Sequence, residues 1–162
     1  MSDPAQQAAE ILLERESAYD ELLKFTTFTF PTFVVADHHR LICEMLQKVE
    51  LGECHRLMIF MPPRHGKSEL ASRRFPAWFM GRNPDSSIIH ASYGQELATD
   101  FGRDVREIVN SEEYQKVFEG TKLSQDATAA NKWRIADRRG EYFAVGVGTS
   151  ATGRGADLLI ID

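Results

Sequence analysis

Hydrophobic positions in the first third of the chain recur at helical spacing. Residues 4–24 carry apolar side chains three and four positions apart with acidic residues between them, which predicts a helix that Asp3 can cap. Residues 26–33 are aromatic and rich in threonine, and we expect them to be extended. Residues 37–50 return to helical spacing and predict a second helix.

Two short apolar runs then indicate strands that are buried on both faces. Residues 56–61, RLMIFM, and residues 87–93, SIIHASY, are nearly continuous in apolar side chains. A helix is predicted after each run, over residues 68–80 and 95–110, because the apolar positions there resume helical spacing.

The last third of the chain adds shorter strand patterns. Residues 133–135 and 142–147 alternate between apolar and polar positions, and residues 158–161, LLII, lead directly to Asp162. Strands alternating with helices predict an α/β fold, with a mostly parallel sheet and helices on both faces. Ligands of such sheets bind beyond the carboxyl ends of the strands, where Met61 and Asp162 are expected.

Composition and charge narrow the classes of function. The chain has 162 residues, of which 43% are hydrophobic and 27% charged, as in an ordinary globular domain. Its net charge of -5 argues against a surface that binds nucleic acid everywhere, although a local basic patch remains compatible with it. We find neither an apolar run of the ~18–20 residues that span a bilayer nor a signal peptide, and we therefore expect a cytoplasmic protein without a membrane segment.

The cysteines and histidines do not predict a zinc site. Cys43 and Cys54 are the only cysteines, and without a secretion signal we expect free thiols. His38, His39 and His55 lie near them in the sequence, but the spacings match no compact zinc motif.

The strongest chemical signal is the segment 61–68, MPPRHGKS, between a predicted strand and a predicted helix. Gly66 would let the backbone approach a phosphate group, Lys67 would place its charge on the β- and γ-phosphates, and Ser68 would offer its hydroxyl to Mg²⁺. The helix that starts there directs free N–H groups and its positive end at the anion. We therefore predict that this loop holds ATP and magnesium through Pro63, Arg64, His65, Gly66, Lys67, Ser68 and Glu69.

The loop departs from the usual motif G-x-x-x-x-G-K-[ST], because Met61 stands at the first glycine position. A G-K-S tripeptide at a helix start is by itself a weak signal. Arg64 either adds a second cation beside the phosphates or is a solvated loop residue.

Asp162 is the predicted second half of the site. An apolar strand that ends in aspartate suits a Walker B position, where the carboxylate holds Mg²⁺ together with Ser68. ATPases of this type usually place a second acid directly afterwards, and the sequence ends before it. We therefore expect little or no hydrolysis by this chain alone, and Glu69 is the first alternative acid.

Two further segments leave alternatives open. Residues 146–155, GVGTSATGRG, form either a glycine-rich turn or a mobile loop beside the γ-phosphate, in which Arg154 acts as an arginine finger. His38, His39 and Arg40 either contact adenine or simply cap and solvate their helix, and we favour the second interpretation.

These segments together resemble the N-terminal ATPase half of the large terminase subunit of tailed bacteriophages and prophages. The resemblance covers roughly residues 30–162 and rests on HHRLICEML, RLMIFMPPRHGKSE, SIIHASYGQELATDFGRDVR and TGRGADLLIID. PPRHGKS is its most specific part. The family's loop carries an arginine and often lacks the first glycine, as Arg64 and Met61 do here.

The resemblance implies a RecA-like (ASCE) P-loop NTPase domain over residues 37–162, after a lead-in segment over residues 1–36. It implies a motor in the bacterial host cytoplasm that packs double-stranded DNA, with a portal protein, a small terminase subunit and a ring of its own copies as partners. The C-terminal nuclease domain of the family is absent, so nuclease activity is not expected.

The family also implies a strand, from later in the sequence, between the P-loop strand and the Walker B strand. We therefore expect a fold that is incomplete at the C-terminus, truncated after the Walker B strand, or else a different pairing of these strands. Two other functions stay open: a helicase-like DNA translocase, and a nucleotide-binding module without turnover.

Overall fold

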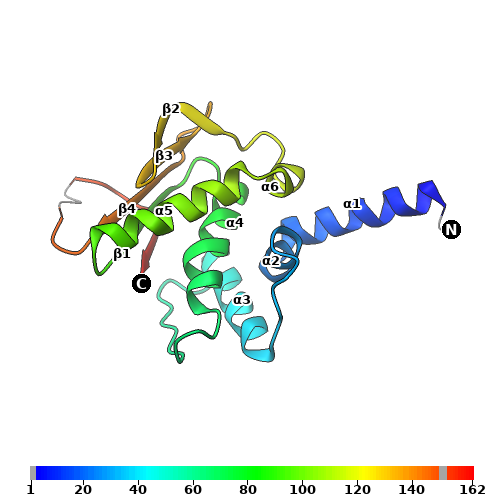
Figure 1. Ribbon diagram of the computed structural model, residues 1–162, viewed down its shortest axis with the longest axis horizontal. Helices are drawn as coiled ribbons and strands as arrows, with labels where there is room; N and C mark the ends of the chain where they lie inside the picture. The colour runs from blue at the N-terminus through cyan, green and yellow to red at the C-terminus, as the bar shows by residue number, and fades with distance from the viewer. Residues whose placement is uncertain (1–2, 150–152) are drawn as a thin grey trace.

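The structure is a computed structural model that describes residues 3–149 and 153–162, and it has the predicted α/β class (Figure 1). The helices are α1 (Pro4–Asp20), α2 (Leu22–Thr29), α3 (Asp37–Glu50), the π-helix η1 (Glu69–Arg74), α4 (Phe75–Arg82), α5 (Gln95–Asn110) and α6 (Glu112–Val117). The strands are β1 (Ser87–Ser92), β2 (Leu123–Ala129), β3 (Lys132–Ile135), β4 (Glu141–Gly146) and β5 (Leu158–Ile161).

The five strands form one mixed sheet in the order β2-β3-β4-β1-β5. Strand β1 lies between β4 and β5 and is parallel to both. Strands β2 and β3 continue the sheet on the other side of β4 in antiparallel pairing. Only one half of the sheet is therefore parallel, and the carboxyl ends of β4, β1 and β5 lie at the same edge.

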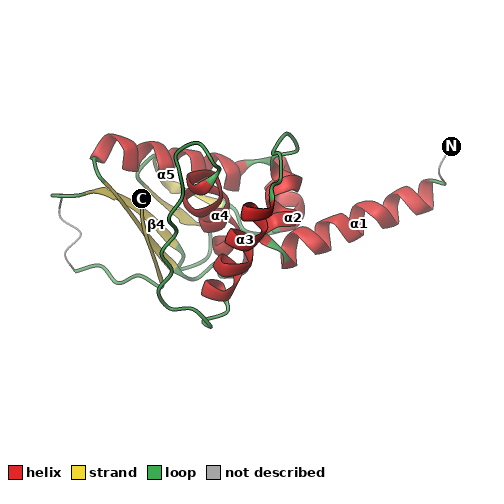
Figure 2. Ribbon diagram, turned by 90° about the horizontal axis from the view of Figure 1, so that it is seen from below, coloured by secondary structure: helices red, strands yellow, loops and turns green. Residues whose placement is uncertain are grey.

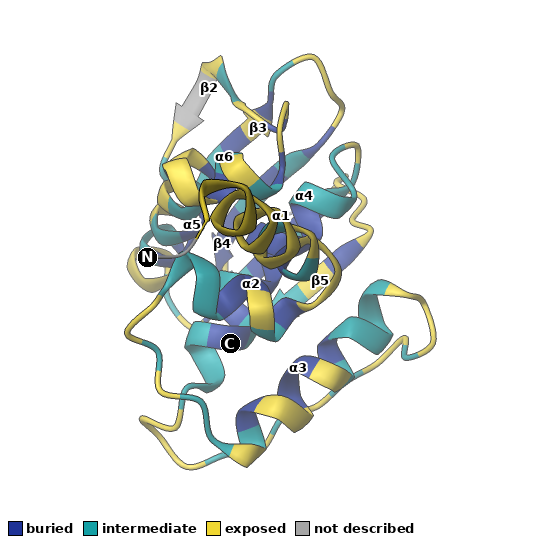
Figure 3. Ribbon diagram, turned by 90° about the vertical axis from the view of Figure 1, so that its right-hand side faces the viewer, coloured by how far each residue is buried: buried dark blue, intermediate teal, exposed yellow. Residues whose placement is uncertain are grey.

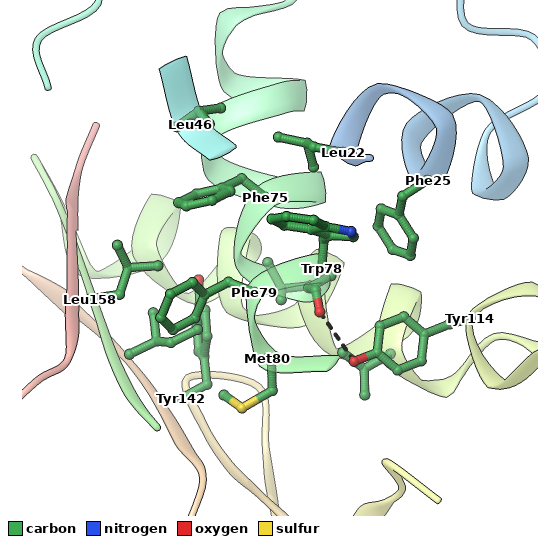
Figure 4. Close-up of a cluster of buried hydrophobic side chains, with 14 of the residues drawn as sticks. Leu22, Phe25, Leu46, Phe75, Trp78, Phe79, Met80, Tyr114, Tyr142 and Leu158 are labelled. Atoms are coloured by element: carbon green, nitrogen blue, oxygen red, sulfur yellow. Dashed lines mark hydrogen bonds between the residues drawn. The ribbon is translucent and has the colours of Figure 1, made fainter. Parts of the chain in front are cut away.

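Helices cover one face of this sheet. Alternate residues of β1 are buried, and this strand lies under α5. Figure 2 shows α5 lying along the sheet, and Figure 4 shows Tyr142 and Leu158 facing Phe79 and Met80 of α4. On the opposite face Leu159 and Ile161 are 57% and 75% exposed. In the part of the chain that the structure describes, the expected second layer of helices is absent.

The predicted N-terminal helix is divided in two, and it extends further than predicted. Helix α1 ends before Glu21, and α2 continues to residue 29, so extended structure was the wrong prediction for the start of segment 26–33. The hydroxyls of Thr26 and Thr29 each donate to the carbonyl four residues earlier, at 2.8 Å, which lets these β-branched residues fit a helix. Helix α1 projects from the body and is mostly exposed, whereas α2 packs on the core (Figures 1 and 3).

The largest departure from the predicted fold concerns residues 56–61, which belong to no strand. Met58 and Phe60 are 80% and 88% exposed, whereas Leu57, Ile59 and Met61 pack against the core. The side chains therefore alternate as in a strand, but within the described part of the chain the backbone has no strand partner, and β5 pairs only with β1. A run of apolar residues predicts burial, and it does not supply the neighbouring strand that a sheet requires.

Candidate nucleotide-binding site

A helix begins directly after Gly66, as the motif predicts. Lys67 and Ser68 are its first helical residues, and the helix continues through η1 and α4. The N–H group of Phe75 donates to the carbonyl of Leu70, five residues earlier, which is the hydrogen bond of a π-helix. Pro76 follows and has no N–H group to donate, and a π-helical turn accommodates such an interruption.

The loop before this helix turns sharply at two positions. Arg64 and Gly66 have φ angles of 65° and 80°, in the left-handed region that glycine adopts most readily. The ring N–H at Nδ1 of His65 donates to the carbonyl of Pro63, at 2.8 Å, and closes the loop on itself. The side chain of Arg64 is exposed.

Lys67 and Asp162 are in direct contact. The Lys67 ammonium donates to one carboxylate oxygen of Asp162, and the Ser72 hydroxyl donates to the other at 2.6 Å. The backbone fixes Asp162 as well, since its N–H group donates to Ala91 O at 3.0 Å and its carbonyl accepts from Ser92 Oγ at 2.9 Å. The structure thus brings together, beyond the carboxyl end of the parallel strands, two residues that the sequence separates widely.

Asp162 is ionised in this setting. Burial of the carboxyl acts to raise its pKa, but hydrogen bonds from Lys67, Ser72 and Ser68 and the charge of Lys67 outweigh burial and hold the pKa below 3.8. A carboxylate that is charged at neutral pH is the form that can bind a metal ion.

Ser68 and Asp162 fit the expected magnesium site. The Ser68 hydroxyl lies close enough to the Asp162 carboxylate to help lower its pKa, so two oxygen ligands lie near each other. Within residues 3–149 and 153–162, no group of three or more His, Cys, Asp or Glu side chains could hold a metal ion by itself. Mg²⁺ bound with ATP needs only one or two protein oxygens, because phosphate and water complete its shell.

Glu69 is engaged by arginines and not free beside the loop. Its carboxylate accepts from Arg74 Nε at 2.7 Å and lies 3.9 Å from Arg73 Nη1. Arg73 also donates to Asp104 at 2.6 Å. These ion pairs tie the first turns of the helix to α5.

Arg154 lies at the other end of the parallel strands. Its Nη1 donates to Glu141 Oε1 at 2.5 Å, and its guanidinium lies 4.3 Å from the centre of the Phe143 ring. Glu141 is the first residue of β4, whereas Asp162 follows the last residue of β5. The structure therefore does not bring Arg154 to the loop of its own chain. Residues 150–152 of the predicted glycine-rich loop lie outside the described residues.

His39 at the start of α3 caps that helix, as we favoured. Its Nδ1 accepts from the N–H group of Ala36 at 3.0 Å. His38 and His39 also border a pocket of about 330 Å³, which Arg64 lines from the loop side. The adenine alternative therefore stays open.

Three residues of this region were not predicted. Ser72 holds Asp162, and it was detectable because it lies four positions after Ser68 and so on the same helix face. Ser92 holds the Asp162 backbone from the end of β1, and the sequence carried no signal for that contact. His90, on β1, is fully buried with Nδ1 2.6 Å from the Tyr142 hydroxyl, and burial lowers its pKa to about 4.

The cysteines match the sequence prediction. Cys43 and Cys54 are both free, and burial raises the pKa of the Cys43 thiol to about 12. A thiol with so high a pKa stays protonated and unreactive at neutral pH.

Comparisons with known proteins indicate neither a family nor a function for this chain. No protein-family model matches the chain, and neither a curated protein nor a solved structure matches it significantly. Among the helices that the structure describes, none combines the length and apolar composition needed to cross a bilayer.

Proposed function

We propose that this chain binds Mg²⁺-ATP at residues 61–68 and forms the ATPase part of a terminase-type motor that packs viral DNA. The contact between Lys67 and Asp162 carries the proposal. A flexible cation, a serine hydroxyl and an ionised carboxylate meet at a helix start and a strand end, and these are the groups that P-loop ATPases use for phosphate and magnesium.

Binding of ATP would require Lys67 to exchange its partner, the Asp162 carboxylate, for a phosphate. The Lys67 side chain is 35% exposed, so its ammonium group can exchange the carboxylate for a phosphate oxygen. Asp162 and Ser68 would then be left to hold Mg²⁺, which when bound neutralises charge on the phosphates. Ser72 and Ser92 keep the carboxylate in place during this exchange.

The unpaired segment 56–61 also supports a RecA-like P-loop NTPase fold. In the family that the sequence resembles, a further strand lies between the P-loop strand and the Walker B strand. Among the described residues β5 has one strand partner, and residues 56–61 have the side-chain alternation of a strand without any partner. A strand between them could pair with both, as the proposed fold requires.

The partners follow only from the resemblance. Double-stranded DNA, a portal protein, a small terminase subunit and a ring of copies in the bacterial host cytoplasm belong to this proposal. A helicase-like translocase would share the same nucleotide site.

A module that binds nucleotide without turnover is the second candidate. The arginine contacts of Glu69 favour it, because this alternative acid is not free to activate water. The chain accordingly presents the groups for binding ATP more clearly than the groups for hydrolysing it.

Titration of the chain with a fluorescent ATP analogue, with Mg²⁺ and with EDTA, tests the site. Asp162→Asn should weaken binding about tenfold or more with Mg²⁺, because a charged ligand to the metal is lost. With EDTA the same variant should bind at least as well as wild type, because a carboxylate that competes for Lys67 is gone. Asp126→Asn, at an exposed aspartate, is the matched control. Equal loss under both conditions would contradict a magnesium role for Asp162.

A further inference from the structure

His39 joins the start of α3 to the phosphate-binding loop. Its Nδ1 accepts from the Ala36 N–H group, and its Nε2 lies 3.0 Å from the carbonyl oxygen of His65. A carbonyl can only accept, so Nε2 carries the proton and Nδ1 does not. Both ring nitrogens are thus used, and the two contacts require the same neutral tautomer.

The ring of His39 also fills the space beside Gly66. A Cβ atom on Gly66 would lie 2.6 Å from His39 Nε2. Any residue other than glycine at this position would therefore displace the histidine ring. The rings of Phe33 and His38 pack on His39 with centroids 4.8 Å and 4.0 Å away, and the histidine is buried. The ring is therefore fixed from several sides, and the glycine of the motif is fitted to it.

The hydrogen bond to His65 has a consequence for the next amide. In a trans peptide the carbonyl and the following N–H group point in opposite directions. With the His65 carbonyl held toward α3, the N–H group of Gly66 points away from α3. That amide belongs to the loop segment whose N–H groups would face the phosphates.

We propose that His39 is a positioning residue that orients the Gly66 amide for phosphate binding. The phosphate part of this inference rests on the proposed function, whereas the ordering of the loop does not. Without the contact, the peptide between His65 and Gly66 can rotate, and a phosphate group would have to order it on binding.

Two substitutions separate the loop contact from the helix cap. In His39→Asn the side-chain oxygen takes the place of Nδ1 and keeps the Ala36 contact, but no atom reaches His65. In His39→Gln the amide supplies both an acceptor and a donor, and glutamine at this third helical position is a usual capping residue. Both variants lose the ring packing, so the difference between them reports the loop contact. His55→Asn, at an exposed histidine, is the control for the substitution itself.

The first measurement is amide hydrogen exchange of residues 64–68 in the chain without added nucleotide. We expect exchange about 3- to 10-fold faster in His39→Asn than in His39→Gln, the size of one net hydrogen bond. The second measurement is Mg²⁺-ATP affinity, in which we expect His39→Asn to be weaker by a similar factor and His39→Gln to approach wild type.

The outcomes distinguish this inference from the proposed function. Equal exchange in the Asn and Gln variants overturns the positioning role of His39. A difference in exchange without ATP binding by any variant, wild type included, supports the ordering of the loop and refutes the nucleotide site. Full ATP affinity in His39→Asn, despite faster exchange, overturns the phosphate part alone.

Discussion

Acid should destabilise this protein through His90. His90 is fully buried, its ring stacks on Phe101 at 4.8 Å, and in the described chain its Nε2 has no hydrogen-bond partner. Burial lowers its pKa from 6.5 to about 4, while the charge of Asp162 opposes the shift and that of Arg73 adds to it.

The size and sign follow from proton linkage. The folded-state pKa of about 4 lies two to three units below the unfolded value of 6.5, and each pKa unit corresponds to 1.36 kcal/mol, so the full effect is about 3 kcal/mol. The unfolded chain takes up the proton first, so stability is unaffected by His90 above pH 6.5. It then falls as the pH is lowered toward about 4, with a slope approaching 1.4 kcal/mol per pH unit.

Urea unfolding between pH 7.5 and pH 4.5 measures this slope. His90→Asn keeps a polar partner for the Tyr142 hydroxyl and removes the titrating group. Its free energy of unfolding should therefore fall less steeply with decreasing pH, by up to about 1.4 kcal/mol per pH unit. His55→Asn, at an exposed histidine, should keep the wild-type slope. The reasoning is refuted if wild type and His90→Asn lose stability in parallel. Asp162 contributes in a lower range, because its depressed pKa keeps its contribution until the pH falls below 3.8.

Other substitutions test the departures from the predicted fold and site. In urea unfolding, the exposed-site substitution Phe60→Ser should change the free energy of unfolding by less than ~0.5 kcal/mol. Phe75→Ala, at a buried position, should lower it by about 3–5 kcal/mol. Similar losses for the two variants would show that segment 56–61 is buried. Arg154→Ala should leave ATP binding by this chain unchanged, since the side chain pairs with Glu141. In a full-length motor Arg154→Ala should lower ATP turnover by a factor on the order of 10³. Mixing Arg154→Ala subunits with Lys67→Ala subunits should partly restore turnover, because the arginine of one subunit can serve the intact nucleotide site of the other. Absence of rescue, with normal assembly, would rule out a finger acting between subunits.

Local signals in the sequence predicted most helices of this fold. The helix over residues 37–50 and the helix after Gly66 appear where apolar spacing and the loop motif placed them, because the contacts within a helix span only a few residues. The strand prediction for residues 56–61 failed for the opposite reason. Its side chains alternate correctly, but pairing depends on a distant strand that local sequence does not specify.

The residues of the candidate site also differ in whether local sequence or distant contacts place them. Lys67, Ser68 and Asp162 were predicted from a motif and a strand end, and the structure brings them together. The position of Arg154 could not be predicted, because it is set by an ion pair with Glu141 on strand β4. The contact of His39 with the loop likewise depends on how α3 packs, which the sequence of α3 alone does not reveal.

Calorimetric titration of the chain with Mg²⁺-ATP, for wild type and Lys67→Ala, tests the central claim most directly. Loss of a charged hydrogen bond to phosphate should cost about 1.5–3 kcal/mol, or roughly 10- to 150-fold in affinity. Lys116→Ala, at an exposed lysine, should bind as wild type does. Unchanged affinity in a folded Lys67→Ala variant, or no Mg²⁺-ATP binding by wild type, would contradict the assignment of residues 61–68 as a nucleotide site.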